Sequence, residues 1–109
     1  MGDRVAGTFF QNWINGGPTE ATRETALGGA IDGMLAEQVI LEEEGLVSIP
    51  PHLSCAEAST LPCAALTAWS ALISYGNLKA GDIILTQGTG GVSIFALQFA
   101  VIQGARVIS

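Results

Sequence analysis

Charged residues are scarce in this sequence, and basic residues are the scarcest of them. Only 13% of the 109 residues are charged, with 4 Lys or Arg against 10 Asp or Glu and a formal net charge of −6. Binding to nucleic acid or to an anionic membrane surface needs a cationic surface. The composition therefore predicts that neither nucleic acid nor a membrane is a partner.

The sequence also has few cysteines and no long apolar run. Cys55 and Cys63 are the only two cysteines, which is too few for a disulfide framework. Residues 1–5 lack the apolar centre of a signal peptide, and no run reaches the roughly 18 apolar residues of a transmembrane helix. We therefore expect a reducing, cytoplasmic location.

Hydrophobic residues are abundant by contrast. They make up 49% of the chain, and the mean hydropathy is +0.45. This composition is typical of a globular protein rather than a disordered one. A domain of this size buries only a modest fraction of its surface, so we expect further chain, a partner subunit or a ligand to cover part of it.

The first half of the chain predicts short strands and a long loop. Residues 4–10 form an expected strand, and residues 11–33 an irregular loop with several glycines. Alternating polarity predicts a strand over residues 34–41. Another brief strand is expected from Leu46 to Ile49, before two prolines.

A helix is expected in the middle of the chain. Ser54 and Glu57 have the spacing of a capping box, in which each side chain satisfies a backbone N–H. Residues 63–75 contain no glycine, proline or charge and carry apolar residues at helical spacing. Gly76 is the expected helix stop.

Residues 83–109 carry the most informative pattern. Residues 83–87 are expected to form a parallel strand buried on both faces. A glycine turn at residues 88–93 leads into a helix that ends near Gln103, and residues 106–109 begin a second strand. This order predicts a βαβ unit in the context that a dinucleotide-binding turn requires.

The glycine turn has a chemical explanation. Gly88 allows a tight turn out of the strand, and Gly90, without a Cβ, lets a pyrophosphate approach the backbone. The helix then offers free N–H groups and the positive end of its dipole. The third small position is Ser93 rather than glycine or alanine, which weakens the packing part of the match. The alternative is a glycine-rich helix start that holds no ligand.

The helix that follows the turn is apolar on more than one side. One stripe faces the expected sheet, and a second needs another cover, such as a second domain or subunit. The two stripes consist of Val92, Phe95, Ala96, Phe99 and Ile102, and of Ile94, Leu97 and Val101.

An ordered set of motifs resembles the medium-chain dehydrogenase/reductases, especially the zinc-type alcohol dehydrogenase-like and quinone reductase-like members. The motifs follow the family's order along almost the whole chain. They are Gly2-Asp3-Arg4-Val5, Leu61-Pro62-Cys63-Ala64-Ala65-Leu66-Thr67-Ala68-Trp69, Leu78-Lys79-Ala80-Gly81-Asp82, and the turn from Gly88 to Ser93 with Ala96-Leu97-Gln98-Phe99-Ala100 after it.

The resemblance implies an α/β fold in two parts. Residues 1–60 would be part of a GroES-like, β-rich substrate domain, and residues 61–109 the first βαβ unit of a Rossmann NAD(P)-binding domain. It implies hydride transfer between a nicotinamide dinucleotide and a small alcohol, carbonyl, enone or quinone. A homo-oligomer of the full-length form is compatible with this family.

The resemblance also implies the residues that bind the cofactor. Thr67 would lie near the nicotinamide, the backbone of Gly90 to Ser93 would hold the pyrophosphate, and Val92 would pack towards the nicotinamide side. A helical threonine can equally bond a carbonyl one turn back, and both readings of Thr67 stay open. The full expected set is Thr67, Gly88, Thr89, Gly90, Gly91, Val92 and Ser93.

Several features expected of a whole enzyme are not in this sequence. In dinucleotide-binding domains an acidic residue about 20 residues after the glycine turn binds the ribose hydroxyl of NAD. In this sequence no Asp or Glu follows Asp82. The choice between NAD and NADP is therefore open, with only a slight preference for NADP. No catalytic general acid can be named, and the isolated chain is expected to be an inactive or nearly inactive fragment.

Ligand counting argues against zinc. Zinc-dependent relatives use a cysteine near the position of Cys63, but zinc needs at least three protein ligands. His52, Cys55 and Cys63 are the only imidazole or thiol candidates. A buried apolar role for Cys63 is the plainer reading.

Two other functions stay open: a truncated, non-catalytic dinucleotide-binding or assembly segment, and a structural module that binds no nucleotide.

Overall fold

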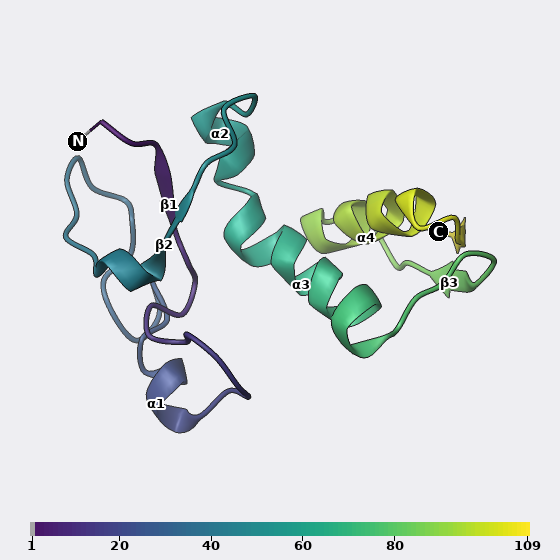
Figure 1. Ribbon diagram of the computed structural model, residues 1–109, viewed down its shortest axis with the longest axis horizontal. Helices are drawn as coiled ribbons and strands as arrows, with labels where there is room; N and C mark the ends of the chain where they lie inside the picture. The colour runs from purple at the N-terminus through teal and green to yellow at the C-terminus, as the bar shows by residue number, and fades with distance from the viewer. Residues whose placement is uncertain (1) are drawn as a thin grey trace. The chain divides into compact units, whose positions relative to one another are not determined.

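The computed structural model describes residues 2–109 and divides the chain into two compact units (Figure 1). The first unit ends at Pro62 and the second begins at Cys63. Both strands and helices are present, so the fold is mixed α/β. No helix among the described residues is long and apolar enough to cross a membrane.

The first unit is built on a short antiparallel strand pair. Strand β1 (Val5–Gly7) pairs with β2 (Leu46–Ser48), with Ala6 opposite Val47. The short helix η1 (Glu43–Gly45) leads directly into β2. The two strands lie where the sequence predicts them, but each is shorter than predicted.

The long segment between these strands differs from the prediction in two places. A one-turn helix, α1 (Glu20–Arg23), interrupts the expected loop, and Thr19 and Thr22 cap it reciprocally. The strand predicted over residues 34–41 is wrong. Leu35 and Ile40 are fully exposed, and no strand among the described residues pairs with this segment. Alternation without a partner does not hold an extended chain in a sheet.

The capping box that the sequence predicts at Ser54 is confirmed. The Ser54 hydroxyl oxygen accepts a hydrogen bond from the Glu57 N–H at 3.2 Å, and the Glu57 carboxylate accepts one from the Ser54 N–H at 2.8 Å. Together they begin helix α2 (Cys55–Ala58), whose last residue is buried.

The helical stretch expected over residues 63–75 is present, but it is not a uniform α-helix. A π-helical segment η2 (Leu61–Ala65) precedes α3 (Leu66–Trp69), and a second π-helical segment η3 (Ser70–Tyr75) follows it. The proline in the first segment cannot donate a backbone hydrogen bond, which is consistent with a wider turn there.

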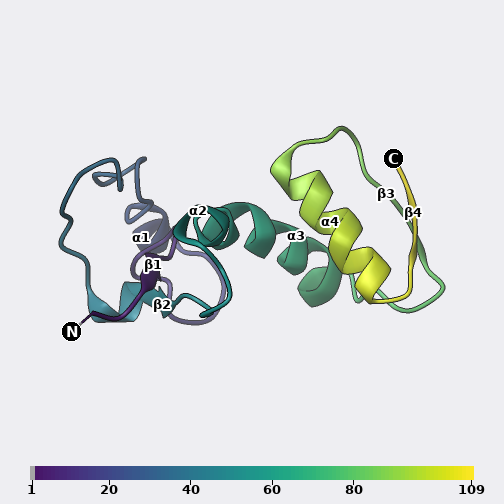
Figure 2. The same cartoon turned by 90° about the horizontal axis from the view of Figure 1, so that it is seen from above.

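The second unit contains the predicted strand, turn, helix and strand. Strands β3 (Ile83–Leu85) and β4 (Arg106–Ile108) are parallel, with Ile84 opposite Val107. Helix α4 (Gly91–Ile102) connects them and packs against β4 (Figure 2). It also packs against α3, so α4 lies between a helix and a two-stranded sheet.

The expectation that the first of these strands is buried on both faces is wrong for the described chain. Ile83 and Leu85 are 60% and 66% exposed, because β3 has β4 as its one neighbouring strand among the described residues. Helix α4 is likewise only partly covered. Ala100 is fully buried, whereas Val101 and Ile102 are exposed on the two different stripes.

Candidate dinucleotide-binding turn

The turn between β3 and α4 is shaped by its glycines. The N–H of Thr86 still donates to the Ile108 carbonyl at 2.8 Å, which extends the parallel pairing past the end of β3. Gly88 then adopts a φ of +81°, a left-handed conformation that glycine accepts without strain. Gly90 returns to an extended conformation and is the N-cap residue directly before α4.

Open space surrounds the two glycines before the helix. A Cβ built on Gly88 or on Gly90 would meet no atom within 4 Å. Gly90 has a φ of −71° and a ψ of 165°, which any residue can adopt. The fold therefore does not need a glycine at position 90, whereas a ligand that approaches the backbone would.

The amino end of α4 presents unpaired backbone donors. Its first regular hydrogen bond runs from the Ile94 N–H to the Gly90 carbonyl at 3.0 Å. No side chain caps this end, and its first turn holds no acidic residue. The N–H groups of residues 91–93 therefore lie at the positive end of a three-turn helix dipole and are available to an anion.

Gly91 differs from its neighbours because it touches the helix before β3. A Cβ at Gly91 would lie 3.4 Å from the Cβ of Ala64. Ala64 precedes Thr67 by one helical turn, so α4 begins beside the same stretch of helix that carries Thr67. A larger residue at either contact position would push the two helices apart.

Ser93 closes the turn with its side chain. Its hydroxyl donates to the carbonyl oxygen of Gln87 at 3.0 Å, which connects the first turn of α4 to the chain just after β3. Ser93 is half-buried, and Thr89 and Val92 beside it are exposed. The expected residues 88–93 therefore form one continuous surface around the amino end of α4.

Thr67 is exposed on α3, and its hydroxyl donates to the Cys63 carbonyl at 2.7 Å. The structure thus contains the local bond that was one of the two readings of this residue. The hydroxyl oxygen keeps lone pairs that can accept another hydrogen bond. Its role beside a nicotinamide remains a prediction.

Sequence reasoning missed two residues that shape the turn. Ala64 sets the approach of the two helices, and the Gln87 carbonyl holds Ser93. Ala64 lies in a motif that the sequence did show, but its contact with Gly91 depends on the tertiary fold. A backbone carbonyl such as that of Gln87 leaves no signal in the residue type.

The thiols and the imidazole do not form a metal cluster. Among residues 2–109, no group of three or more His, Cys, Asp or Glu could hold a metal ion. Cys55 lies 3.7 Å from the guanidinium of Arg4, which donates more strongly to the Leu53 carbonyl. Cys63 is exposed rather than buried, so the small apolar role predicted for it is wrong.

This combination of a parallel βαβ unit and a glycine turn corresponds to part of an alcohol dehydrogenase structure. A solved protein from Sinorhizobium meliloti 1021, described as an alcohol dehydrogenase, matches with a TM-score of 0.88 and 51% identity. The match covers 97% of this chain and 32% of that protein. An alcohol dehydrogenase superfamily protein from Novosphingobium aromaticivorans matches with a TM-score of 0.66 and 36% identity, over 73% of this chain and 24% of that one.

Curated sequences point to the same class. A zinc-type alcohol dehydrogenase-like protein of Schizosaccharomyces pombe is 46% identical over 97% of this chain and 31% of its own length. A chloroplastic quinone-oxidoreductase homologue of Spinacia oleracea is 35% identical over 94% of this chain and 32% of its own length. No family model matches the chain.

The resemblance to alcohol dehydrogenase-like and quinone reductase-like oxidoreductases is therefore confirmed. The chain spans about a third of the length of the curated relatives it matches. The S. pombe relative is called zinc-type, but the residues described above do not by themselves supply a zinc site.

Proposed function

We propose that the turn at residues 88–93 binds the pyrophosphate of a nicotinamide dinucleotide. The observation that carries this proposal is the uncapped amino end of α4 behind a glycine turn whose backbone is open to approach. A pyrophosphate placed there would accept hydrogen bonds from the N–H groups of residues 91–93. Residues 61–109 would then be the first βαβ unit of a Rossmann domain, and residues 1–60 part of a GroES-like substrate domain.

The reaction proposed for the whole protein is hydride transfer to or from a small alcohol, carbonyl, enone or quinone. Its support is the class of the relatives, which cover the chain almost completely. The bound nicotinamide supplies the hydride chemistry. The residues of this chain hold the diphosphate, and Thr67 on α3 borders the nicotinamide ring. The isolated chain, about a third of its relatives' length, should bind the cofactor without measurable turnover.

NADP is the preferred cofactor in this proposal. Among residues 83–109 the only charged side chain is that of Arg106, the first residue of β4. A carboxylate at the end of the second strand would bond the ribose 2′-hydroxyl of NAD and repel the 2′-phosphate of NADP. Without such a carboxylate on β4, the 2′-phosphate meets no repulsion from this strand.

Titration of the full chain with NADPH and NADH, followed by nicotinamide fluorescence, tests the proposal. Saturable binding of NADPH, displaced by inorganic pyrophosphate, is the expected result. NADPH should bind more tightly than NADH. If neither dinucleotide binds saturably, the turn is only a helix start and the proposal fails.

Two glycine variants separate a loss of binding from a loss of folding. Gly90→Val keeps an allowed backbone conformation, and its Cβ meets no protein atom within 4 Å, but it fills the space of the pyrophosphate. It should leave the melting temperature unchanged and weaken NADPH binding by roughly tenfold or more. Gly81→Ala is the control, because Gly81 has a φ of +89° and lies outside the turn. It should lower the melting temperature and leave the affinity of the folded chain unchanged.

A further inference from the structure

Ser93 joins the two ends of the glycine turn. It is the third residue of α4, and its hydroxyl donates across the turn to the Gln87 carbonyl at 3.0 Å. Four residues lie between Thr86, which extends the pairing of β3, and the start of α4, and all four are exposed: Gln87, Gly88, Thr89 and Gly90. No side chain packs on either glycine within 4 Å of a Cβ position. The Ser93 hydroxyl thus forms a side-chain hydrogen bond that spans this turn.

We propose that Ser93 is a positioning residue that orders the turn before the diphosphate binds. This inference rests on the function proposed above. A turn with two glycines has a large conformational entropy to lose when a ligand fixes it. A hydrogen bond that restrains the turn in the free chain removes part of that loss from the binding step.

The hydrogen bond also decides how Ser93 meets the ligand. A serine hydroxyl has one proton, and that proton is committed to the Gln87 carbonyl. The hydroxyl therefore does not donate to a phosphate oxygen while this bond is intact. The backbone N–H of Ser93, which lies in the uncapped first turn of α4, is the donor that the residue offers.

This role makes a prediction opposite to that of the general dinucleotide-binding motif. In that motif the third small position, here Ser93, serves only close packing of helix and strand, and alanine fills it as well as glycine. On that basis Ser93→Ala should bind the dinucleotide as well as the parent chain or better. If Ser93 orders the turn, Ser93→Ala should bind less tightly.

The experiment compares Ser93→Ala, Ser93→Thr and the parent chain with two probes, NADPH and inorganic pyrophosphate. Loss of one hydrogen bond predicts that Ser93→Ala weakens binding of both probes by roughly 2- to 10-fold. Ser93→Thr keeps the hydroxyl and should recover most of the affinity. Ser74→Ala is the matched control, because Ser74 is an exposed helical serine whose hydroxyl makes no hydrogen bond to the other described residues.

Amide hydrogen exchange in the free chain gives a readout that binding alone does not. The Ile94 amide, whose hydrogen bond to the Gly90 carbonyl begins α4, should exchange faster in Ser93→Ala than in the parent chain, while the amides of β3 and β4 should not change. A general loss of stability would speed exchange throughout the second unit.

The outcomes are distinguishable. Equal affinities of the parent chain and Ser93→Ala, with saturable binding by both, overturn the positioning role and leave the proposed function standing. Weak binding by Ser93→Thr as well as Ser93→Ala assigns the effect to packing and also overturns it. A parent chain that binds neither probe overturns the proposed function and this inference together.

Discussion

The side-chain amide of Gln11 lies against the α-carbon of Gly45 and leaves no space there for a side chain. Its nitrogen donates to the carbonyl oxygens of Thr8 at 2.7 Å and Gly45 at 3.2 Å. Gln11 is only 9% exposed, so this is a buried polar contact between the segment after β1 and the turn before β2. The first unit has few large buried side chains, and its geometry depends on such polar contacts.

Gly45→Ala should therefore destabilise the chain. The new methyl group would clash with the Gln11 amide, which is held by its own hydrogen bonds and cannot easily move. We expect a loss of about 1–3 kcal/mol in the free energy of unfolding, as for other overpacked sites. Urea denaturation measures it. Gly17→Ala is the matched control, because a Cβ there meets nothing within 4 Å; equal stabilities of the two variants would contradict the contact.

The carboxyl group of Glu57 should titrate below its usual range. The Ser54 hydroxyl and then the Ser54 N–H donate to this carboxylate and lower the pKa of Glu57. A folded-state pKa below the unfolded value contributes stability above the unfolded pKa, and this stability is lost as pH falls through the folded pKa. The loss should occur on the acid side of the ordinary glutamate range.

An NMR titration of the Glu57 side-chain carboxyl carbon checks this prediction. Ser54→Ala removes the first and largest cause of the shift, so the Glu57 pKa should move back towards its ordinary value. Ser59→Ala changes a serine on the same helix whose hydroxyl bonds a different acceptor, the Ala56 carbonyl. It should leave the Glu57 pKa where it is, and a similar pKa in both variants would rule out the capping box as the cause.

Gly76 ends the long helix for a reason that differs from the expected one. It keeps a right-handed conformation, and the left-handed residue is Asn77, with a φ of 49°. A Cβ at Gly76 would lie 2.6 Å from the Ala71 carbonyl oxygen and 2.7 Å from that of Leu72. The Leu78 N–H then donates back to the Leu72 carbonyl at 3.0 Å, which closes the helix end.

Substitutions at this helix end should therefore have unequal effects. Gly76→Ala places a methyl group against two backbone oxygens that cannot move aside, and should cost about 1–3 kcal/mol of unfolding free energy. Asn77→Gly accepts the left-handed conformation and should change stability by no more than about 1 kcal/mol. Thermal unfolding of the two variants checks the order, and a larger loss in Asn77→Gly would contradict this geometry.

The parts of the structure that local sequence decides were predicted well. The capping box at Ser54 depends on two side chains three residues apart, and it is present. The order of β3, glycine turn and α4 depends on glycine conformations and helix periodicity, which are also local. In the candidate site, residues 88–93 lie together around the amino end of α4 for the same reason.

The parts that depend on distant chain were predicted less well. The pattern at residues 34–41 has the alternation of a strand, but a strand needs a partner, and none among the described residues pairs there. The apolar residues of β3 predicted burial on both faces, yet burial is set by what packs on the strand and not by its composition. The Ala64–Gly91 contact and the Ser93–Gln87 hydrogen bond could not be predicted from the sequence for the same reason.

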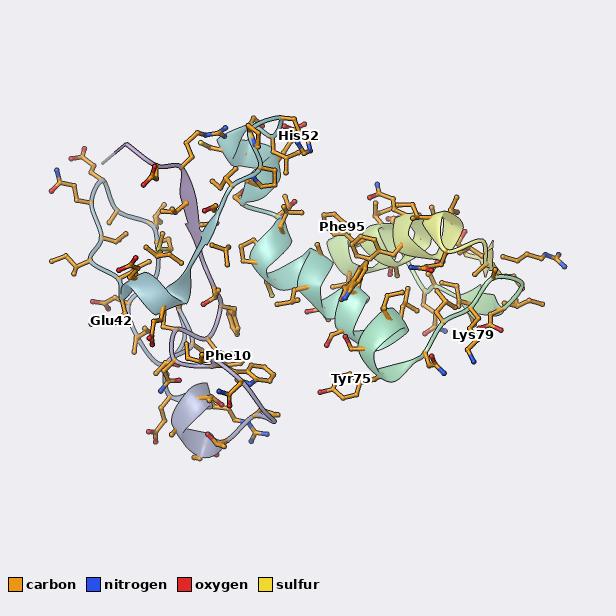
Figure 3. All side chains as sticks on the ribbon, in the orientation of Figure 1. Phe10, Glu42, His52, Tyr75, Lys79 and Phe95 are labelled. Atoms are coloured by element: carbon orange, nitrogen blue, oxygen red, sulfur yellow. The ribbon has the colours of Figure 1, made fainter. Side chains whose placement is uncertain are left out.

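The packing of α3 on α4 should depend on one pair of aromatic rings. The rings of Trp69 and Phe99 are perpendicular, with centroids 5.4 Å apart, and Phe99 also stacks on Phe95, which is labelled on α4 in Figure 3. Edge-to-face pairs contribute about 0.5–1.5 kcal/mol beyond the area they bury. A double-mutant cycle with Trp69→Ala and Phe99→Ala should give a coupling energy in this range.

A second cycle serves as the control. Tyr75 lies at the end of η3, is largely exposed, and does not pair with another aromatic ring among residues 2–109. Tyr75→Ala and Phe99→Ala should therefore destabilise additively, to within about 0.5 kcal/mol. Thr67 lies on α3 and the glycine turn begins α4, so the Trp69–Phe99 contact joins the two helices that carry them. Trp69→Ala should consequently weaken NADPH binding, and a coupling energy near zero in the first cycle would mean that these rings do not fix the two helices.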